Sequence, residues 1–345
     1  MTNQVIDLRS DTVTKPTSAM YKAMQNAVLG DDVLDGDPTV QDLETFAAQK
    51  VGMEAALFVP SGCMGNQIAL ASHCQRGDSV LLEEEAHILY YEAGSASIIA
   101  GVTLCSLPSN DGIIDPLEIE KKIIPKSIHT PGTTLLCLEN THNRKGGTII
   151  PPETMENYSA IAKKYGLKVH LDGARIFHAA VALEVDVKKF TQHVDSIMFC
   201  LSKGLGSPAG SMLCGTHEFI ETCKLWRKRL GGSMRQIGIL AACGIVSLNQ
   251  NIERLTKDHQ KAKKLSHALQ GLPGIQVDHK NVQTNMVMIH TKQTAEVWVE
   301  KLKQAGTLIL AFRPHTLRAV FHYDISDEEL HLAIEVFKNV AAKLI

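Results

Sequence analysis

The chain has 345 residues, and 44% of them are hydrophobic, so it can bury a large core without disulfides. Its net charge of -2 comes from interspersed acids and bases, which leaves no positive region for nucleic acid or for an anionic membrane. Small molecules are therefore the expected partners.

The eight cysteines are scattered without a CxxC pair, and several lie within apolar runs. Buried, reduced thiols of this kind favour a cytoplasmic protein over a secreted one. Acids occur by position 7, so no secretory signal is expected. Two uncharged segments, 93–110 and 236–252, contain polar residues and fall short of the ~20 apolar residues of a membrane span.

The N-terminal segment, residues 6–16, has too few apolar residues for a core strand but carries polar side chains such as Ser10 and Asp11. These either reach into a site or cap the helix expected over 18–27. The acids between 31 and 44 lack the spacing of a helix-loop-helix calcium site, so a solvated loop is expected before the helix that begins near residue 38.

The first candidate site residues are Ser61, Gly62 and Cys63, which follow an apolar strand and precede a helix expected over 64–74. The N-H groups and the positive end of such a helix bind anions, and glycine lets a phosphate approach. The stretch matches neither a Walker loop nor a GxGxxG motif, so an ordinary strand-to-helix turn is the alternative.

Two histidines lie beside the next strands. His87 follows a strand over 79–82, and it either stacks on a cofactor ring, transfers protons or makes a structural hydrogen bond. His129 precedes a strand over 134–138, and a structural role is favoured for it. After that strand, the polar residues 139–143 again face the expected ligand side.

Two buried strands then end in reactive side chains. One, over 167–171, ends at Asp172; the other, the apolar run 197–201, breaks into a glycine-containing loop at Lys203. Ligands of an open parallel sheet lie outside the carboxyl ends of its strands, so both side chains are expected to face one pocket. Pyridoxal phosphate needs this pair, a lysine for its aldehyde and an acid beside its pyridinium nitrogen. The alternative is a surface lysine in an ordinary loop.

Strands and helices alternate from about residue 55 to 215, which predicts an α/β fold with a mostly parallel sheet covered by helices on both faces. We expect a large domain over 1–250, including the N-terminal segment 1–17, and a small α+β domain over 251–345. Helices are expected over 153–165, from 218 to 230, over 235–249 and over 253–269, and strands of the small domain over 285–290, 308–312 and 317–322.

Two arginines in this second half stand out. Arg235 follows a pair of glycines and is either a phosphate or a partner contact. Arg318 lies within an apolar strand, where a guanidinium needs an anion. That anion is either a substrate carboxylate or a buried structural acid.

Ten motifs along nearly the whole chain carry a resemblance, in this order: LRSDTVTKPT, GDD, DPTVQDLE, PSGCMGNQ, AHILYYEAG, LENTHN, HLDGARIFHA, CLSKGLGSPAGS, GGSMRQ and LRAVFH. With these motifs the chain resembles the low-specificity L-threonine aldolases, which use pyridoxal 5'-phosphate and have the aspartate aminotransferase fold (fold type I). The resemblance implies retro-aldol cleavage of L-threonine or L-allo-threonine to glycine and acetaldehyde.

The resemblance also implies roles for the site residues. Lys203 would form the Schiff base, Asp172 would contact the pyridine nitrogen, and His87 would stack on the ring. Further residues would complete the cofactor site: Ser61, Gly62, Cys63, Arg175, Ser202 and, from a neighbouring subunit, Arg235. The residues that would bind the substrate carboxylate are Ser10, Arg175 and Arg318. His129 would lie near the substrate hydroxyl. The chain would form a homotetramer, a dimer of dimers with active sites at subunit interfaces.

One position departs from the family, which commonly has threonine where this chain has Cys63. Because a thiol is a weaker donor than a hydroxyl, we expect weaker retention of the cofactor and unchanged chemistry.

Several alternatives stay open at this point. The base for the substrate hydroxyl is His87, His129 or a water, and no metal ligands are assigned, although the family can bind a cation. The preference between the threonine isomers is also undecided. The rival functions are another fold type I enzyme, a β-eliminating lyase or an aminotransferase, and a non-catalytic interaction protein of the same fold.

Overall fold

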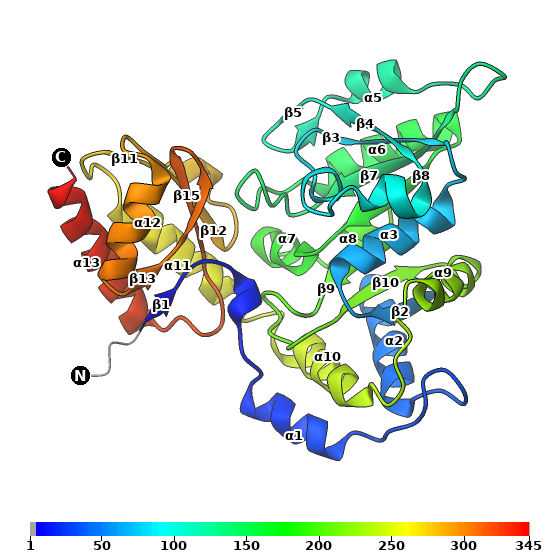
Figure 1. Cartoon of the computed structure of the whole chain (residues 1–345), viewed down its shortest axis with the longest axis horizontal. Helices are drawn as coiled ribbons and strands as arrows, with labels where there is room; N and C mark the ends of the chain where they lie inside the picture. Colours follow the sequence, from blue (N-terminus) through cyan, green and yellow to red (C-terminus); the bar gives the residue numbers. More distant parts are fainter. Residues whose placement is uncertain (1–4, 345) are drawn as a thin grey trace.

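A seven-stranded sheet forms the centre of the larger part of the molecule in the computed structural model, which describes residues 5–344 (Figure 1). The strand order is β2-β10-β9-β8-β7-β3-β4. All neighbours pair in parallel except β10, which is antiparallel to both β2 and β9. The strands are β2 (Ala55–Val59), β3 (Ser79–Glu83), β4 (Thr103–Leu107), β7 (Thr133–Glu139), β8 (Lys168–Asp172), β9 (Ser196–Cys200) and β10 (Ser211–Gly215). The predicted α/β fold with a mostly parallel sheet is confirmed.

The sheet is buried on both faces, which explains why its strands are apolar runs without alternation. In β9, Ile197 and Phe199 belong to one hydrophobic cluster, whereas Met198 and Cys200 belong to another on the opposite face. The first cluster joins the sheet to α2 (Pro38–Val51), α6 (Pro152–Tyr165), α7 (Ile176–Leu183) and α10 (Gly238–Gln250). The opposite face is covered by α3 (Gly62–His73) and α9 (His217–Arg229).

The helix boundaries follow capping signals in the sequence. Asp37 accepts hydrogen bonds from the backbone of Thr39 and Val40 and is followed by Pro38 at the first position of α2. Thr17, rather than Ser10, caps the first helix, because Ser10 caps a separate 3-10 turn over Asp11–Val13. The remaining helices of this part are α1 (Ser18–Asn26), α4 (His87–Tyr90), α5 (Pro116–Lys122), α8 (Lys188–Thr191) and a π-helical turn over Ala96–Ala100.

The C-terminal part is a smaller α+β unit built on a four-stranded sheet of order β11-β12-β15-β14. Its strands are β11 (Ile275–Gln276), β12 (Met286–Thr291), β14 (Leu310–Arg313) and β15 (Thr316–Val320). Its helices are α11 (Leu255–Ala268), α12 (Ala295–Gln304), α13 (Asp327–Lys343) and a 3-10 turn over His279–Asn281. A hairpin, β5 (Ser109–Asn110) with β6 (Ile113–Ile114), belongs to the larger part.

Two sequence expectations were wrong here. Residues 308–312 are not one strand: β13 (Thr307–Leu308) and β14 are separated at Ile309, and β13 pairs with β1 (Ile6–Asp7). Residues 6–16 therefore do contain a strand, which two apolar residues suffice to anchor because Ile6 and Leu8 are buried in the C-terminal core. β1 lies against the small unit, whereas α1, which follows it, lies against the large one (Figure 1). The division of the chain into domains over 1–250 and 251–345 remains our proposal. Residues 1–4 and 345 of these domains lie outside the described part of the chain.

Candidate active site

Five strand ends converge at one edge of the large sheet, and the predicted site residues follow them. Because β2, β3, β7, β8 and β9 all run in the same direction, their carboxyl ends lie at the same edge. In register, Asp172 of β8 lies opposite Glu139 of β7 and Met198 of β9. Ser61 to Cys63 follow β2, His87 follows β3, and Lys203 follows β9. The sheet therefore brings these separate segments to one place.

Asp172 presents a buried, firmly held carboxylate. The residue is 3% exposed; its Oδ2 accepts a hydrogen bond from Asn66 Nδ2 at 2.8 Å, and its Oδ1 accepts one from the backbone N-H of Ala174 at 3.1 Å. Asn66 also donates to Glu92 Oε1 at 2.8 Å and contacts His170 Nε2 through its own Oδ1 at 3.1 Å. This amide therefore fixes two carboxylates with one side chain.

Lys203 lies half-buried in the loop after β9, where its carbonyl accepts a hydrogen bond from Gly206 N-H at 2.8 Å. Its ammonium makes no hydrogen bond or ion pair with any other residue from 5 to 344, although its charge contributes, after Arg175, to the lowered pKa of the nearby Asp11. A Cβ on the next residue, Gly204, would lie 2.3 Å from Nε2 of buried His178. Only glycine therefore fits at position 204, directly after Lys203.

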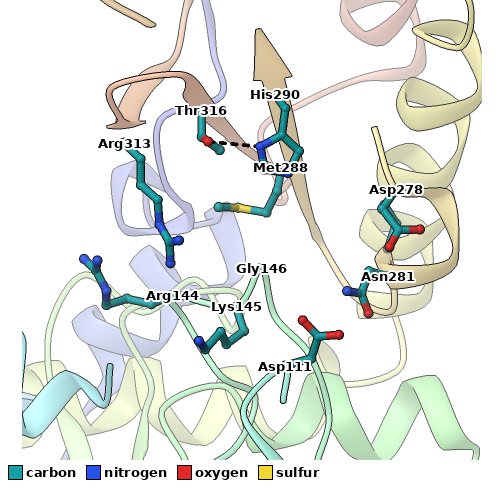
Figure 2. Close-up of a pocket in the computed structure, with 11 residues that line it drawn as sticks. Asp111, Arg144, Lys145, Gly146, Asp278, Asn281, Met288, His290, Arg313 and Thr316 are labelled. Carbon is teal, nitrogen blue, oxygen red and sulfur yellow. Dashed lines mark hydrogen bonds between the residues drawn. The ribbon is translucent and has the colours of Figure 1, made fainter. Parts of the chain in front are cut away.

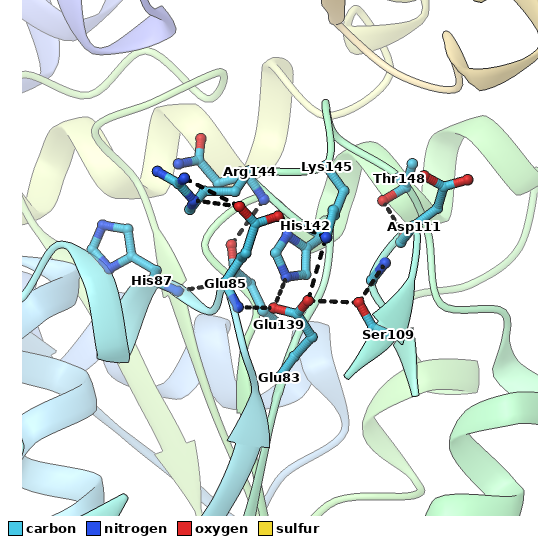
Figure 3. A network of polar contacts seen from close by, with 12 residues as sticks. Glu83, Glu85, His87, Ser109, Asp111, Glu139, His142, Arg144, Lys145 and Thr148 are labelled. Atoms are coloured by element: carbon cyan, nitrogen blue, oxygen red, sulfur yellow. Dashed lines mark hydrogen bonds and ion pairs between the residues drawn. The ribbon is translucent and has the colours of Figure 1, made fainter. Parts of the chain in front are cut away.

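His87 is held at its backbone and at one ring nitrogen. Its N-H donates to Glu139 Oε2 at 2.6 Å, and its Nδ1 lies 2.9 Å from Glu92 Oε1. Burial lowers the pKa of the imidazole, but the hydrogen bond with Glu92 and the charges of Asp172 and Glu139 outweigh burial and raise it overall. The contact with Glu92 fixes the orientation of the ring, and Figure 3 shows the backbone contact of His87 with Glu139.

The start of α3 provides the predicted anion site. Ser61 caps the helix by accepting from Met64 N-H, and the N-H groups of Gly62 and Cys63 make no hydrogen bond within residues 5–344. A Cβ at Gly62 would lie 2.9 Å from Cys200 Sγ, so the helix start is packed closely against β9. Free N-H groups at the positive end of a twelve-residue helix suit a phosphate.

Two arginines approach this edge in different ways. Arg175 donates from Nε to Asp11 Oδ2 at 2.7 Å and from Nη2 to Asp11 Oδ1 at 2.5 Å, and both side chains are almost fully buried. Arg318, on β15 of the small unit, is 7% exposed and donates from Nη1 to Asn143 Oδ1 at 2.7 Å. Its buried Nε has no partner among the described residues. Burial and the charge of Arg175 lower the pKa of Arg318 to about 10.

Arg318 therefore carries a buried positive charge without an acid bonded to it in the part of the chain described. Of the two anions considered from the sequence, no structural acid forms an ion pair with this guanidinium between residues 5 and 344. Its unpartnered Nε leaves room for an external carboxylate.

Four predicted residues lie elsewhere or make other contacts. His129 is exposed in the loop before β7, at the opposite edge of the sheet, so the protomer does not bring it to Lys203. Arg235 is bonded to Asp31 at 3.0 Å and is about half exposed. Ser10 accepts from Thr12 N-H at 3.2 Å, next to the Asp11–Arg175 pair. Ser202 is half-buried beside Lys203.

Several residues of the site were not assigned from the sequence: Asn66, Glu92, Glu139 and Asn143. Asp11 was considered only together with Ser10, as a residue that either reaches into a site or caps a helix. A signal existed for Asn66, which with Gln67 forms a polar pair inside an otherwise apolar helix and is 0% exposed. For Asn143 and Glu139 the sequence predicted only that the polar stretch 139–143 faces the ligand side, without a role for either residue. Glu139 proves central, because its two oxygens accept from the backbone of His87 and of Asn143.

A network of charges next to this site joins the two units. Figure 3 shows the part of it that lies on the large unit, around Glu85, Arg144 and Lys145. Glu85 contacts Lys145 at 2.6 Å, Arg144 at 3.1 Å and, from β14 of the small unit, Arg313 at 2.8 Å. Burial raises the pKa of Glu85, but the hydrogen bonds from Lys145 and Arg144 lower it to about 2. Glu85 thus remains ionised and ties the small unit to the large one.

A cavity of 380 Å³ lies beside this network, between the loop at Gly146 and the small sheet (Figure 2). Its lining includes Arg144, Lys145, Met288, His290, Arg313 and Thr316, and none of the predicted site residues. Three of its cations already bind Glu85, so they are not free to hold a ligand. The candidate active site is therefore assigned from side-chain chemistry rather than from cavity volume.

The residues at the sheet edge fit pyridoxal 5'-phosphate. The site has an unpaired amine, a buried carboxylate, a fixed imidazole and the free N-H groups of a helix start. The unpartnered Nε of Arg318 adds a place for the carboxylate of an amino acid. These are the groups required by the aldehyde, the ring nitrogen, the ring face, the phosphate and the substrate.

Comparisons with known proteins agree with this chemistry. The model of the beta-eliminating lyase family matches residues 7–292. The chain is 44% identical to low-specificity L-threonine aldolase 1 of Arabidopsis thaliana, with 98% of this chain and 97% of the relative covered. It is 41% identical to the low specificity L-threonine aldolase of Escherichia coli K12, with 94% and 96% covered.

Solved structures show the same fold. The threonine aldolase of Leishmania major superposes with a TM-score of 0.83 at 18% identity, covering 97% of this chain and 99% of that one. A Thermus thermophilus aspartate aminotransferase double mutant superposes with a TM-score of 0.71 at 15% identity, covering 98% and 92%. The predicted fold type I is therefore confirmed. From its matching family model and its relatives of 41–44% identity, this chain belongs to the beta-eliminating lyase family, among the low-specificity L-threonine aldolases.

Proposed function

We propose that this protein cleaves L-threonine and L-allo-threonine to glycine and acetaldehyde with pyridoxal 5'-phosphate as its cofactor. The observation that carries the proposal is the meeting of an unpaired lysine, Lys203, and a buried carboxylate, Asp172, at the ends of adjacent strands. Packing alone does not explain such a pair at a ligand-binding edge. The names of the curated relatives support the substrate class.

We assign the cofactor contacts as follows. Lys203 binds the aldehyde, Asp172 faces the ring nitrogen, His87 covers a ring face, and the start of α3 at Ser61, Gly62 and Cys63 binds the phosphate. When bound, the cofactor supplies an electron sink for a bond broken at the α-carbon of an amino acid. Asp172 serves this chemistry because Asn66 and the Ala174 N-H hold its carboxylate in place.

Substrate orientation is the task we assign to the arginines. Arg318 offers its unpartnered Nε to the substrate carboxylate, while Arg175 lies nearby with one edge occupied by Asp11. A carboxylate fixed by guanidinium groups restrains the α-carbon, and this selects which of its bonds is cleaved. Ser10 is close enough to Asp11 to complete this side of the site.

The proton of the substrate hydroxyl needs an acceptor. Of the two histidines considered for this role we favour His87, because it follows β3 at the same sheet edge as Lys203, whereas His129 precedes β7 at the opposite edge. We assign the proton to His87 or to a water that His87 holds. Because the pKa of His87 is raised, the neutral, accepting form of the ring gains population as pH rises through that value.

We also propose a homotetramer, built of two dimers, in the cytoplasm, acting in glycine formation and threonine breakdown. Arg235 supports an interface near the site, because this guanidinium is exposed and, among residues 5–344, bound only to Asp31. The eight free cysteines support a reducing compartment. None of the helices within residues 5–344 is long and apolar enough to span a membrane.

The test incubates the cofactor-loaded protein with each threonine isomer and measures acetaldehyde and glycine. Lys203→Ala is expected to lose turnover by several orders of magnitude. Lys168→Ala is the matched control, because Lys168 lies at the start of β8, is exposed and pairs with Asp195; it should keep normal turnover. A keto acid in place of glycine and acetaldehyde would instead indicate a lyase or aminotransferase reaction, and near-normal turnover by Lys203→Ala would refute the assignment.

A further inference from the structure

A second chemical feature lies in the same region. Cys63 Sγ, a ring nitrogen of His87 and a carboxylate oxygen of Glu92 all lie within 4.8 Å of one another. They come from the start of α3, the start of α4 and the segment after α4. Thiolate, imidazole and carboxylate are the three ligand types that bind Zn²⁺ in proteins. The cluster thus has the donor set of an open, three-ligand metal site.

The positions need little movement to bind a metal. Ligand atoms about 2.0–2.3 Å from a tetrahedral Zn²⁺ are roughly 3.4–3.7 Å apart. His87 Nδ1 and Glu92 Oε1, at 2.9 Å, would separate slightly, and Cys63 Sγ would approach by at most about 1.4 Å. Cys63 is exposed, so both the side-chain rotation and the entry of an ion from solvent are possible.

The carboxylate of the cluster is already oriented by neighbouring groups. Asn66 Nδ2 donates to Glu92 Oε1 at 2.8 Å, and Gln67 Nε2 donates to Glu92 Oε2. Residues that hydrogen-bond a metal ligand in this way raise the affinity of metal sites, because the ligand needs no reorganisation. Glu92 itself is buried, whereas His87 is partly exposed, so the site opens toward the solvent.

We propose that Cys63, His87 and Glu92 bind one Zn²⁺ or a similar thiophilic ion when the cofactor is absent. Binding forms three metal-ligand bonds and releases the proton of the thiol, while neutral His87 binds through Nδ1 and carries its hydrogen on Nε2. Desolvation, together with Glu92 and Asp172, raises the pKa of the Cys63 thiol to about 11, so the metal has to displace the thiol proton. A hard ion such as Mg²⁺ is excluded by the sulfur and nitrogen ligands.

A consequence follows for the cofactor, and it rests on the proposed function. The N-H of Cys63 belongs to the helix start that we assign to the phosphate, and His87 is assigned to the ring. A metal held by both side chains occupies the space between them, so metal and cofactor should exclude one another. The threonine common at this position in the family has no thiolate, and the metal site is thus particular to Cys63.

The direct test uses Co²⁺, which gives an intense thiolate-to-metal absorption when cysteine is a ligand. The full-length chain is freed of cofactor and titrated with Co²⁺ alone, and bound metal is also counted by equilibrium dialysis. One Co²⁺ per chain with this absorption is expected, displaced by Zn²⁺ and unaffected by Mg²⁺. Cys63→Thr should lose the absorption, and Glu92→Gln should weaken binding by roughly tenfold or more.

The matched control is Cys105→Ser, which removes another partly exposed cysteine, one that contacts Ser79 away from the cluster. It should bind Co²⁺ like the original chain. The proposal is overturned if the original chain lacks the absorption, or if Cys63→Thr keeps it with its fold intact by circular dichroism.

A second measurement separates the metal site from the cofactor assignment. Zn²⁺ is expected to slow the uptake of pyridoxal 5'-phosphate, followed by the absorbance of bound cofactor, in the original chain and not in Cys63→Thr. If the Co²⁺ absorption is present but uptake is unchanged, the metal site stands, while mutual exclusion and the phosphate position at Cys63 are wrong. Threonine cleavage is not used in either measurement.

Discussion

The buried pair of Asp11 and Arg175 gives the sharpest prediction about stability. Both side chains are excluded from solvent, and two hydrogen bonds of 2.7 and 2.5 Å join them. Asp11 also offsets the charge of Lys203. Asp11→Asn removes the negative charge and leaves the guanidinium buried without its counter-ion.

The magnitude follows from burial. Removing one partner of a buried ion pair costs about 3–5 kcal/mol, because the remaining charge cannot be solvated. Asparagine keeps one oxygen acceptor, so we expect a loss near the lower limit, about 3 kcal/mol in the free energy of unfolding. The matched control is Asp7→Asn: Asp7 also binds an arginine, Arg9, through two nitrogens, but Arg9 is exposed, and exposed pairs contribute about 0–1 kcal/mol.

The assay is equilibrium unfolding in urea at neutral pH, with protein concentration and cofactor saturation held equal for all variants. Both substitutions lie in the same N-terminal segment, so differences in local flexibility largely cancel. Equal destabilisation by Asp11→Asn and Asp7→Asn would refute the argument that burial sets the cost. The double variant Asp11→Asn with Arg175→Met should cost less than the sum of the single changes, since the uncompensated charge is then gone.

Three further outcomes are expected. Asn143→Ala should raise the KM for threonine by roughly 10-fold or more, because Arg318 loses a charge-assisted hydrogen bond; an unchanged KM would show that this contact does not position the guanidinium. Glu92→Gln should lower the pKa of His87, measured by NMR. The pKa of His87 is higher in the folded than in the unfolded chain, so protonated His87 stabilises the fold below about pH 6.5. This stabilisation is lost as the pH rises through the pKa of the folded state. It should be smaller in Glu92→Gln. Cys63→Thr should bind the cofactor several-fold more tightly, by about 0.5–1.5 kcal/mol, and equal affinity would show that the hydroxyl makes no phosphate contact.

Much of the large unit was predictable because its signals are local. Apolar strands that end in polar residues marked β7, β8 and β9, and Pro38 and the glycine-rich turns marked helix starts and loops. The edge of the sheet where Asp172 and Lys203 lie follows from strand direction alone. The prediction failed where pairing is non-local: β1 has two residues, and only its partner β13, 300 positions away along the chain, makes it a strand.

The contacts of the site residues were less accessible to sequence reasoning. Arg175 was expected to face a substrate, yet Asp11 occupies one edge of its guanidinium. The role of Asn143 could be assigned only from the structure, in which Arg318 of the small unit donates a hydrogen bond to it. The same holds for Glu139, which accepts from the Asn143 backbone. Side chains from distant segments compete for the same hydrogen-bonding groups, and that competition is invisible along the chain.

By itself, the sequence determined the chemical groups available, the parallel sheet and the edge where its strands deliver those groups, because apolar runs, turns and end residues are encoded within short stretches. The tertiary structure alone decided which carboxylate pairs with which cation, since only folding brings Asp11 to Arg175 and leaves Arg318 without an acid from the described part of the chain. It also decided that a thiol, an imidazole and a carboxylate meet at Cys63, because their three segments touch only when the sheet edge has formed.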